Sequence, residues 1–481
     1  MPRVLLAVLG VAVLVLPVAA RAEEPAATTV PTTVPTTGAP PATTSLPATT
    51  APPSTVASAP STAAETATTV TDEAGYRAAL ATLSADATGP HTIDLGADIT
   101  VDDGTDPTYT GTQPLTIDGH GFTLDAFWTS RLLVVDSPTD AAVTLTAITL
   151  DHGSSGPGGG GGAVLVRNDS PLTITDSNLW HNSGDTGGGA VQAATTATIE
   201  RSDFTRNETG GDGGAIDATA PEGRITVRDS SFSNNWAAGE GGAISAVGFG
   251  SPSASEGIVR STFTANEAGQ GGALVLGTGV VVANSTFVGN RALTTGGAIL
   301  GTGRSLSALI YVTVTENIAP EGANLTNRGV DLYVIFSALG EPQDGANCAF
   351  PQGAFHITES RVDDSSCPGA REVADLGLGL FGDHGGHTGT RVPLAGSPLI
   401  DAIDANFGFP SIPGGCANFQ GTGPLDQRGV ERPQDGDGRT RTYVYDQTYE
   451  VAADCDIGAV EAEAFVAPPS GPVSGGPAFT G

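Results

Sequence analysis

Two short segments near the C-terminal end carry residues that could bind a cation. Asp435-Gly436-Asp437-Gly438 alternates carboxylates with glycines, which suits a hard ion such as Ca²⁺, although the complete twelve-residue calcium loop is missing. Asp383-His384-Gly385-Gly386-His387 could supply one carboxylate and two imidazoles, but glycine-flanked histidines also occur in ordinary turns. We therefore expect no resident metal or cofactor, with Ca²⁺ as the one candidate ion.

Neighbouring acids and arginines could support proton abstraction from an acidic sugar. Such a polysaccharide lyase gathers carboxylates around Ca²⁺ and uses an arginine as the base. Glu200 with Arg201, and Arg228 with Asp229, are single neighbours and do not form a cluster. The alternative is that they line a solvated edge of the protein. We assign no catalytic and no metal-binding residue from the sequence.

A second set of residues resembles fragments of polygalacturonase-type hydrolases. Gly119-His120-Gly121 and the acidic pairs Asp102-Asp103 and Asp363-Asp364 carry this resemblance. Enzymes of that type also need an Asn-Thr-Asp run and an Arg-x-Lys run, and all 20 basic residues of this chain are arginine. A glycoside hydrolase or polysaccharide lyase is therefore an alternative rather than the favoured function.

A repeat through the middle of the chain must position most of these residues. Six Gly-Gly-Ala copies end at Ala163, Ala190, Ala215, Ala243, Ala273 and Ala298. An asparagine keeps the same step, three residues after an apolar side chain, at Asn182, Asn207, Asn235, Asn266, Asn290 and Asn317. The nearly constant number of residues between successive copies indicates a solenoid, in which each repeat buries its apolar face against its neighbours.

The repeats align into columns that should stack about 4.8 Å apart, the spacing of paired strands. The asparagines can form a ladder of amide hydrogen bonds, and the rings of Phe204, Phe232, Phe263 and Phe287 can stack in the interior. A serine column runs from Ser177 to Ser285, and Asp176, Arg201, Asp229 and Arg260 alternate in charge. Short Val, Ile and Thr runs between glycine clusters predict an all-β coil.

The N-terminal residues indicate export, followed by a spacer and a capping helix. Residues 1–22 have an apolar run and an Ala-Arg-Ala cleavage site, as in a signal peptide, and no later segment is apolar enough to span a membrane. Residues 23–70 are rich in Thr, Pro and Ala and predict a disordered stalk. A helix capped by Thr71 or Asp72, with Tyr76, Ala79, Leu80 and Leu83 on one face, should cover the first turn of the coil.

The repeats resemble those of right-handed parallel β-helix proteins of the polymorphic outer-membrane-protein type, whose motifs are Gly-Gly-Ala-(Ile/Leu/Val) and Phe-x-x-Asn. The C-terminal part is similar to the bacterial choice-of-anchor Q domain, through Asp426-Gln427-Arg428-Gly429, Arg432-Pro433 and the segment Cys455–Glu461. Together the resemblances cover roughly residues 72–465. We expect a β-helix over residues 71–345, a choice-of-anchor-like region over 346–465 and a flexible tail over 466–481. Because this fold hosts adhesins, lyases and hydrolases, it leaves the chemistry open.

Four cysteines follow the last repeat, at Cys348, Cys367, Cys416 and Cys455. An even number in an exported chain favours disulfides, and four cysteines permit three connectivities. We predict that Cys348 pairs with Cys367, and Cys416 with Cys455, within an irregular C-terminal cap. A zinc site would need closer cysteine or histidine spacing.

The net charge of -32 disfavours nucleic acid and anionic lipid as partners. We expect a secreted or cell-surface protein that acts as an adhesin-like interaction rod, with a cell-surface glycan or a matrix protein as its partner. A passive cell-wall or matrix component is a further alternative. The sequence does not indicate an oligomeric state.

Overall fold

A computed structural model describes residues 66–218, 224–246, 257–303, 307–329, 331–351, 354–403, 425–432, 441–445, 448–452 and 455–462. The predicted signal peptide and the predicted tail lie outside these residues, as does the stalk up to residue 65. The predicted fold class is confirmed. The described residues form a parallel β-helix with one helix near the N-terminus, and no described helix has the length and apolar character to cross a bilayer.

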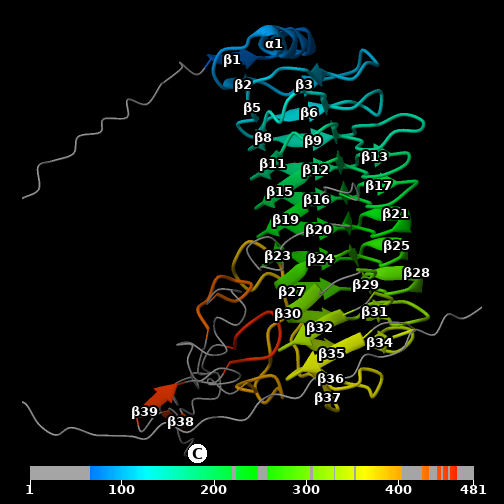
Figure 1. The fold of residues 1–481 in the computed structure, drawn as a ribbon, viewed down its shortest axis with the longest axis vertical. Coiled ribbons are helices and arrows are strands. Elements are labelled where there is room, and N and C mark those ends of the chain that lie inside the picture. Colours follow the sequence, from blue (N-terminus) through cyan, green and yellow to red (C-terminus); the bar gives the residue numbers. More distant parts are fainter. Residues whose placement is uncertain are drawn as a thin grey trace, which may run out of the picture. The chain divides into compact units, whose positions relative to one another are not determined.

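Each turn of the coil contributes strands to a large parallel sheet, which we call sheet A (Figure 1). The first strand of each turn belongs to the series β1 (Thr66–Val70), β2 (His91–Leu95), β5 (Leu115–Asp118), β8 (Val143–Thr146), β11 (Leu172–Thr175), β15 (Thr196–Glu200), β19 (Arg224–Arg228), β23 (Ile258–Val259), β27 (Val281–Val288), β30 (Ser307–Thr315), β32 (Asp331–Ile335) and β35 (Ala354–Thr358).

A bend separates this series from a second strand in most turns. The second series comprises β3 (Ile99–Thr100), β6 (Thr123–Asp125), β9 (Thr149–Asp151), β12 (Asn178–Trp180), β16 (Asp203–Thr205), β20 (Ser231–Ser233), β24 (Thr262–Thr264), β33 (Ala338–Gly340), β36 (Arg361–Val362) and β37 (Arg371–Glu372). β27 and β30 run through the bend and pair with both series.

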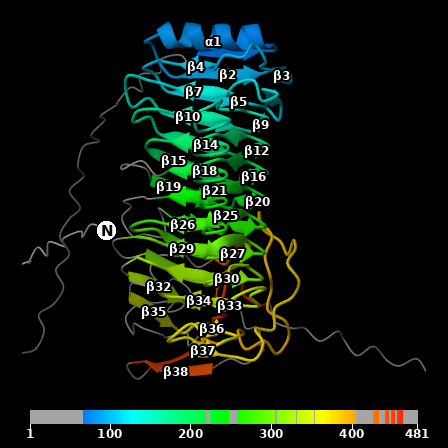
Figure 2. The same cartoon turned by 90° about the vertical axis from the view of Figure 1, so that its right-hand side faces the viewer.

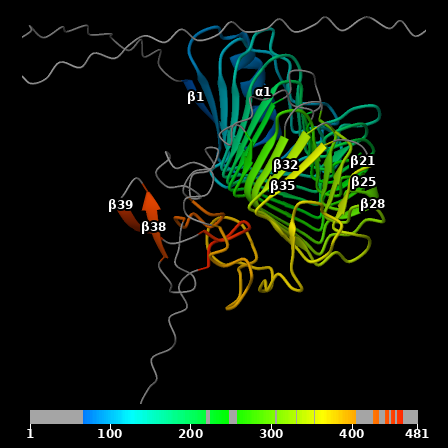
Figure 3. The same ribbon diagram turned by 60° about the horizontal axis from the view of Figure 1, so that its bottom comes forward.

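Two further sheets form the other sides of the coil. Sheet B has ten parallel strands, β4 (Thr108–Tyr109), β7 (Leu133–Val135), β10 (Val164–Val166), β14 (Val191–Ala193), β18 (Ile216–Ala218), β22 (Ile244–Ala246), β26 (Leu274–Leu276), β29 (Ile299–Gly301), β31 (Leu325–Asn327) and β34 (Cys348–Ala349). Sheet C has five, β13 (Ser183–Gly184), β17 (Glu208–Thr209), β21 (Trp236–Glu240), β25 (Glu267–Gln270) and β28 (Arg291–Thr295). Figure 3 looks along the stacked turns.

The helix α1 (Glu73–Ala85) covers the first turns of the coil (Figure 2). Asp72 is its N-cap, and its carboxylate accepts a hydrogen bond from the Gly75 amide at 2.7 Å. The four side chains predicted for its apolar face are all buried. The Tyr76 hydroxyl also donates to the carbonyl of Leu132 at 3.0 Å, which ties the helix to the coil beneath it.

The parallel pairing extends beyond the two boundaries expected for the coil. β1 pairs with β2 over five residues, although its sequence, Thr-Ala-Thr-Thr-Val, has the composition of the stalk. At the other end, β35 pairs with β32 over five residues and β37 pairs with β36, so that the stack reaches Glu372. These last turns lack Gly-Gly-Ala, which is why the repeat alone placed the boundary too early.

The asparagine column forms a continuous ladder inside one corner of the coil, between sheets A and C, which we call the Asn corner. Each Nδ2 donates to the Oδ1 of the asparagine in the next turn, as from Asn207 to Asn235 at 3.0 Å, and to a carbonyl of the preceding turn. Each Oδ1 also accepts from the backbone amide of the preceding asparagine. Beyond Asn317 the ladder continues through Asn324 and Asn347 to Asp363.

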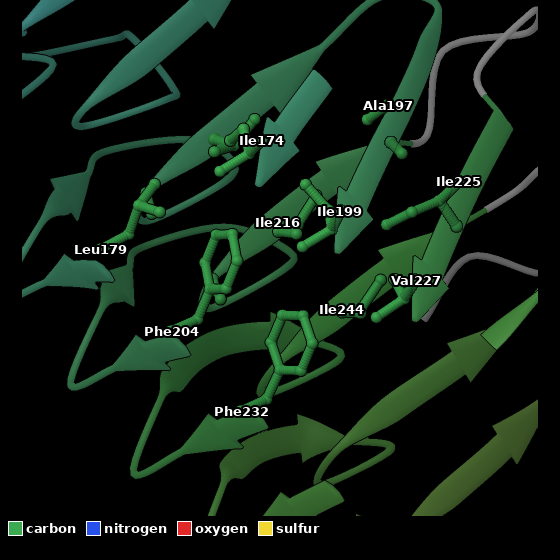
Figure 4. Close-up of a cluster of buried hydrophobic side chains, with 14 of the residues drawn as sticks. Ile174, Leu179, Ala197, Ile199, Phe204, Ile216, Ile225, Val227, Phe232 and Ile244 are labelled. Atoms are coloured by element: carbon green, nitrogen blue, oxygen red, sulfur yellow. The ribbon is translucent and has the colours of Figure 1, made fainter. Parts of the chain in front are cut away.

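Aromatic rings stack beside this ladder in the interior. The centroids of Phe204, Phe232, Phe263 and Phe287 lie 4.6 to 5.0 Å from one another along the stack, with interplanar angles of 12° or less. Figure 4 shows Phe204 and Phe232 pointing into the same apolar core as Ile199 and Val227. Burial of each ring contributes about 1.5–3 kcal/mol, and each aromatic pair adds about 0.5–1.5 kcal/mol.

The two glycines of each Gly-Gly-Ala motif are required for different reasons. The first has a positive φ, for example 71° at Gly213, where a side chain would be strained. The second has no room for a side chain, because a Cβ on Gly214 would lie 2.0 Å from the carbonyl oxygen of Gly242 in the next turn. The alanine that follows is fully buried in every copy. The motif therefore marks a place where neighbouring turns lie too close together for a side chain at its second glycine.

The C-terminal segment, residues 373–462 where described, packs on the outer face of sheet A beside β23, β27 and β30 (Figure 1). β27 and β30 are buried along their whole length for this reason. A second apolar cluster fills this contact and includes Tyr311 and Phe336 from the coil, with Leu376, Leu399 and Ile457 from the C-terminal segment. An antiparallel pair, β38 (Arg441–Tyr445) with β39 (Thr448–Ala452), also belongs to this region.

The motif residues of the C-terminal segment form a buried polar network against sheet A. Arg432 pairs with Glu461, donates to the Gly458 carbonyl at 2.9 Å, and lies 4.1 Å from the ring centroid of Tyr311. Gln427 donates to the Thr262 hydroxyl at 2.8 Å. Burial, together with the Glu461 carboxylate, raises the pKa of Asp456 well above its usual value.

The predicted disulfide between Cys348 and Cys367 is confirmed, with a Cα–Cα distance of 5.2 Å. Cys455 is also disulfide-bonded, and Cys416, its predicted partner, lies outside the described residues. The first bond joins cysteines at a sequence separation of 19 and closes a loop at the last turns of the coil.

We expect Cys348→Ser/Cys367→Ser to destabilise these last turns by about 3 kcal/mol, because the loop gains entropy in the unfolded state. Hydrogen exchange should rise in residues 331–372 and stay unchanged in the turns from β5 to β16. Faster exchange throughout the coil would contradict a local effect.

Candidate functional site

All three tryptophans of the chain are exposed, and all lie at or next to the Asn corner. Trp128, Trp180 and Trp236 are 54%, 38% and 43% exposed. Trp128 follows β6, Trp180 ends β12 and Trp236 begins β21, so that each lies two turns from the next. Tryptophan has the largest side chain to bury, and its exposure three times at one corner of the coil makes this corner a candidate binding site.

Trp236 borders an open depression of about 320 Å³ on sheet C. Its lining is polar and includes Ser154, Ser183, Asp185 and Glu208. Ser183, Glu208 and Trp236 occupy equivalent positions on three adjacent strands, β13, β17 and β21. An exposed indole beside hydroxyls and carboxylates can stack on the apolar face of a sugar ring while the acids accept bonds from its hydroxyl groups.

Two histidines and two aspartates adjoin this depression along the Asn corner. His152 and His181 each stand two residues before a serine of the depression, Ser154 and Ser183. Both histidines have positive φ, 50° and 52°, which turns their side chains out of the two flanking strands. The imidazole rings stack 5.2 Å apart at an interplanar angle of 16°.

Carboxylates from adjacent turns hold these rings in place. His181 Nδ1 lies 3.1 Å from Asp151 Oδ1, and His152 Nδ1 lies 3.2 Å from Asp125 Oδ1 and 3.5 Å from Asp151 Oδ1. The Trp128 ring covers His152 at a centroid distance of 4.1 Å, and its Nε1 donates to the His181 carbonyl at 3.1 Å. This His–Asp cluster, Asp125, Asp151, His152 and His181, is half-buried.

An acid with a perturbed pKa lies at the end of the strand that Trp236 begins. Burial, with the Asp212 carboxylate nearby, raises the pKa of Glu240. The backbone amide of Glu240 donates to Asp212 Oδ1 at 2.7 Å. A glycoside hydrolase also uses a pair of carboxyl groups. Here, however, the hydrogen bond from the Glu240 amide gives Asp212 a structural role.

The alternating charges of the sequence form two bidentate ion pairs at the bend of sheet A. Arg201 donates to both carboxylate oxygens of Asp176 at 2.8 Å, and Arg260 to those of Asp229 at 2.7 and 2.6 Å. All four residues have positive φ. The hydrogen bonds from Arg201 hold the pKa of Asp176 below its ordinary value. Glu200 joins Arg201 at 3.3 Å, so this lyase candidate is part of an ion pair between turns.

The hydrolase candidates lie at different places in the fold. Asp103 accepts from Arg77 near α1, whereas Asp363 and Asp364 accept from Asn347 at the last turns. His120 Nε2 lies 3.2 Å from Asp94 Oδ1. His120 lies two turns before the turn that contains His181. The structure therefore does not bring the acidic pairs and His120 together.

Of the two metal-binding segments considered from the sequence, the first along the chain forms a turn, and the second lies outside the described residues. Asp383 accepts from the Gly385 amide, and His384 contacts the Leu380 carbonyl, so this segment forms a turn. Asp435-Gly436-Asp437-Gly438 lies outside the described residues.

The repeat alignment did not identify the tryptophans or the His–Asp cluster. His181 and His152 directly precede positions in or beside the asparagine column, where other turns have Arg206, Asn234 or Ala265. The signal was present in the sequence as an aromatic or imidazole side chain next to the regular spacing, but periodicity draws attention to residues that repeat and away from those that do not.

Residues 229–247 match the family model described as the Chlamydia polymorphic membrane protein repeat. The matched segment comprises β20, β21 and β22, with Phe232, Asn235 and Gly241-Gly242-Ala243. No curated protein and no solved structure matches the chain. The chain is therefore similar to these membrane proteins in one repeat, and the structure shows the same unit stacked along the coil.

Proposed function

We propose that this protein is an exported, surface-displayed β-helix that binds a glycan through the exposed tryptophans of the Asn corner. The observation that carries the proposal is the exposure of all three tryptophans at one corner, with Trp236 at the edge of a polar depression. Trp128 and Trp236 are four turns apart. At about 4.8 Å for each turn, the distance between them along the coil axis is about 19 Å. This length suits an oligosaccharide rather than a single sugar.

The charge of the depression favours a neutral glycan. Asp185 and Glu208 are the charged residues of its lining, and both are acidic. The whole chain carries a net charge of -32, which repels polyanions such as acidic polysaccharides. A matrix protein is the second kind of partner that an adhesin-like role allows.

Surface display rests on three supports of different kinds. Residues 1–22 resemble a signal peptide, the Thr- and Pro-rich segment after them suits a spacer, and the matched repeat belongs to a family of membrane proteins. The C-terminal motif residues, which resemble a choice-of-anchor Q domain, are buried against sheet A. We propose that this segment covers one side of the coil, and that attachment to the cell depends on residues outside it.

We expect Trp236→Ala to weaken binding to the best neutral oligosaccharide by at least about 10-fold, or 1.4 kcal/mol, because tryptophan is among the residues that contribute most to binding at interfaces. The ligand is first selected on an array of neutral and acidic glycans and matrix proteins, and affinity is then measured by calorimetry. Leu293→Ala is the matched control, because Leu293 is 53% exposed on β28 of the same sheet.

The same samples are screened for cleavage of the bound polysaccharide. Binding without turnover supports the proposal, whereas turnover that is lost in Glu240→Gln would favour a carbohydrate-active enzyme. Failure of every ligand on the array would favour a passive wall component. Equal affinity of Trp236→Ala and the parent protein would place the binding face elsewhere.

A further inference from the structure

The His–Asp cluster of the Asn corner has the chemistry of a transition-metal site. Two imidazole nitrogens and one carboxylate oxygen, from His152, His181 and Asp151, lie within 4.8 Å of one another. Imidazole with carboxylate is a donor set that suits Zn²⁺ better than Ca²⁺ or Mg²⁺, which prefer oxygen ligands alone. We propose that these three residues bind one Zn²⁺ ion.

The spacing of the donor atoms fits this ion. Ligands at about 2.0–2.2 Å from Zn²⁺ in a tetrahedral arrangement lie roughly 3.3–3.6 Å from one another. His152 Nδ1 lies 3.5 Å from Asp151 Oδ1, within this range, and His181 Nδ1 lies 3.1 Å from the same oxygen, slightly below it. Three protein ligands leave one coordination position for water or for an oxygen of a bound molecule.

The fold fixes the donors before any ion arrives. His152 and His181 occupy equivalent positions of adjacent turns and are both held at positive φ. Asp151 Oδ1 also accepts from the His152 amide at 3.0 Å, which orients the carboxylate. The Trp128 ring shields His152 from solvent on one side. A site whose ligands are already oriented loses little entropy when the ion binds.

Electrostatics also favours a cation at this place. Two stacked imidazoles would repel each other if both were protonated, whereas a metal ion binds both as neutral ligands. Asp125 adds a second carboxylate, whose Oδ1 lies 3.2 Å from His152 Nδ1, so that its negative charge faces the same nitrogen that would bind the ion. Asp125 and Asp151 together match the charge of a divalent ion, and the acidic chain attracts cations.

The test is calorimetric titration of the untagged full-length protein with ZnCl₂, with Co²⁺ as a spectroscopic probe. We expect one equivalent of Zn²⁺ to bind, and Co²⁺ to give the visible absorption of a tetrahedral complex. His152→Asn and His181→Asn should each weaken Zn²⁺ binding more than about 100-fold, beyond the loss typical of an outer-shell partner. Asparagine tolerates positive φ, and Asn234 occupies the equivalent position two turns after His181 and three after His152, so the fold should be retained.

His120→Asn is the matched control, because His120 also has a positive φ of 48° and pairs with aspartates, but contributes a single imidazole to its cluster. It should bind Zn²⁺ as the parent does. The absence of saturable Zn²⁺ binding in the parent, or equal affinities in His152→Asn, His181→Asn and the parent, would overturn the proposal. Circular dichroism of each variant shows whether a loss arises from unfolding, and the result does not depend on whether the protein binds a glycan.

Discussion

Asn235→Ala is expected to lower the free energy of unfolding by about 3–6 kcal/mol, because it breaks several buried hydrogen bonds at once. Asn235 Oδ1 accepts from both the backbone amide and the side chain of Asn207, and its Nδ2 donates to the Phe204 carbonyl and to Asn266. The substitution removes these four hydrogen bonds and leaves their partners buried without replacement. Each unsatisfied buried group costs about 1–3 kcal/mol, partly relieved by relaxation. Denaturant unfolding followed by circular dichroism measures the loss.

Asn234→Gly is the matched control for this substitution. Asn234 precedes Asn235 in the chain, but its side chain is exposed and its φ is 56°, which glycine adopts without strain. The free energy of unfolding should change by less than about 0.5 kcal/mol. Similar losses in Asn234→Gly and Asn235→Ala would show that the ladder contributes no more than a surface side chain.

Arg432→Ala is expected to release the C-terminal segment from sheet A while the coil stays folded. The side chains of Arg432 and Glu461 are both fully buried, so the substitution takes the paired cation away from the Glu461 carboxylate in a low-dielectric environment. Loss of one partner from a buried pair costs about 3–5 kcal/mol. It also removes the cation–π contact with Tyr311. Limited proteolysis should then cut between residues 373 and 462.

The control for Arg432→Ala is Arg167→Ala, at an exposed ion pair with Asp136 of 3.2 Å. Exposed pairs contribute about 0–1 kcal/mol, so proteolysis should be unchanged. Loss of the whole β-sheet spectrum in Arg432→Ala would show instead that the coil depends on this segment. An unchanged digestion pattern would contradict a docking role for Arg432.

The repeats were sufficient to predict the architecture, because a stacked coil places the same residue types in the same surroundings at every turn. The spacing of Asn182 to Asn317 therefore predicted the stacking that the hydrogen bonds now describe. Asn324 and Asn347 also belong to the ladder, but they do not follow an apolar-x-x-Asn unit in step with the others. Geometry rather than spacing brings them into line.

The candidate site could not be predicted in this way. Asp125, His152 and His181 come from three successive turns and are far apart in the sequence, so only the register of the coil brings them together. Their turns precede the first Phe-x-x-Asn copy, where the columns are least regular. The burial of the C-terminal motif residues against β27 and β30 could not be predicted either, because no sequence pattern indicates which turns of the coil a later segment covers.

α1 covers the first turns of the coil, and the C-terminal segment packs on the outer face of sheet A beside β23, β27 and β30. The hydrogen bonds described between the C-terminal segment and the coil begin at Arg260, whereas strand pairing joins the turns from β8 to β12 to their neighbours. Duplication of one of these turns by recombination would add about 4.8 Å to the coil and leave both ends intact. The length of the coil can therefore change, by evolution or by engineering, in increments of one turn.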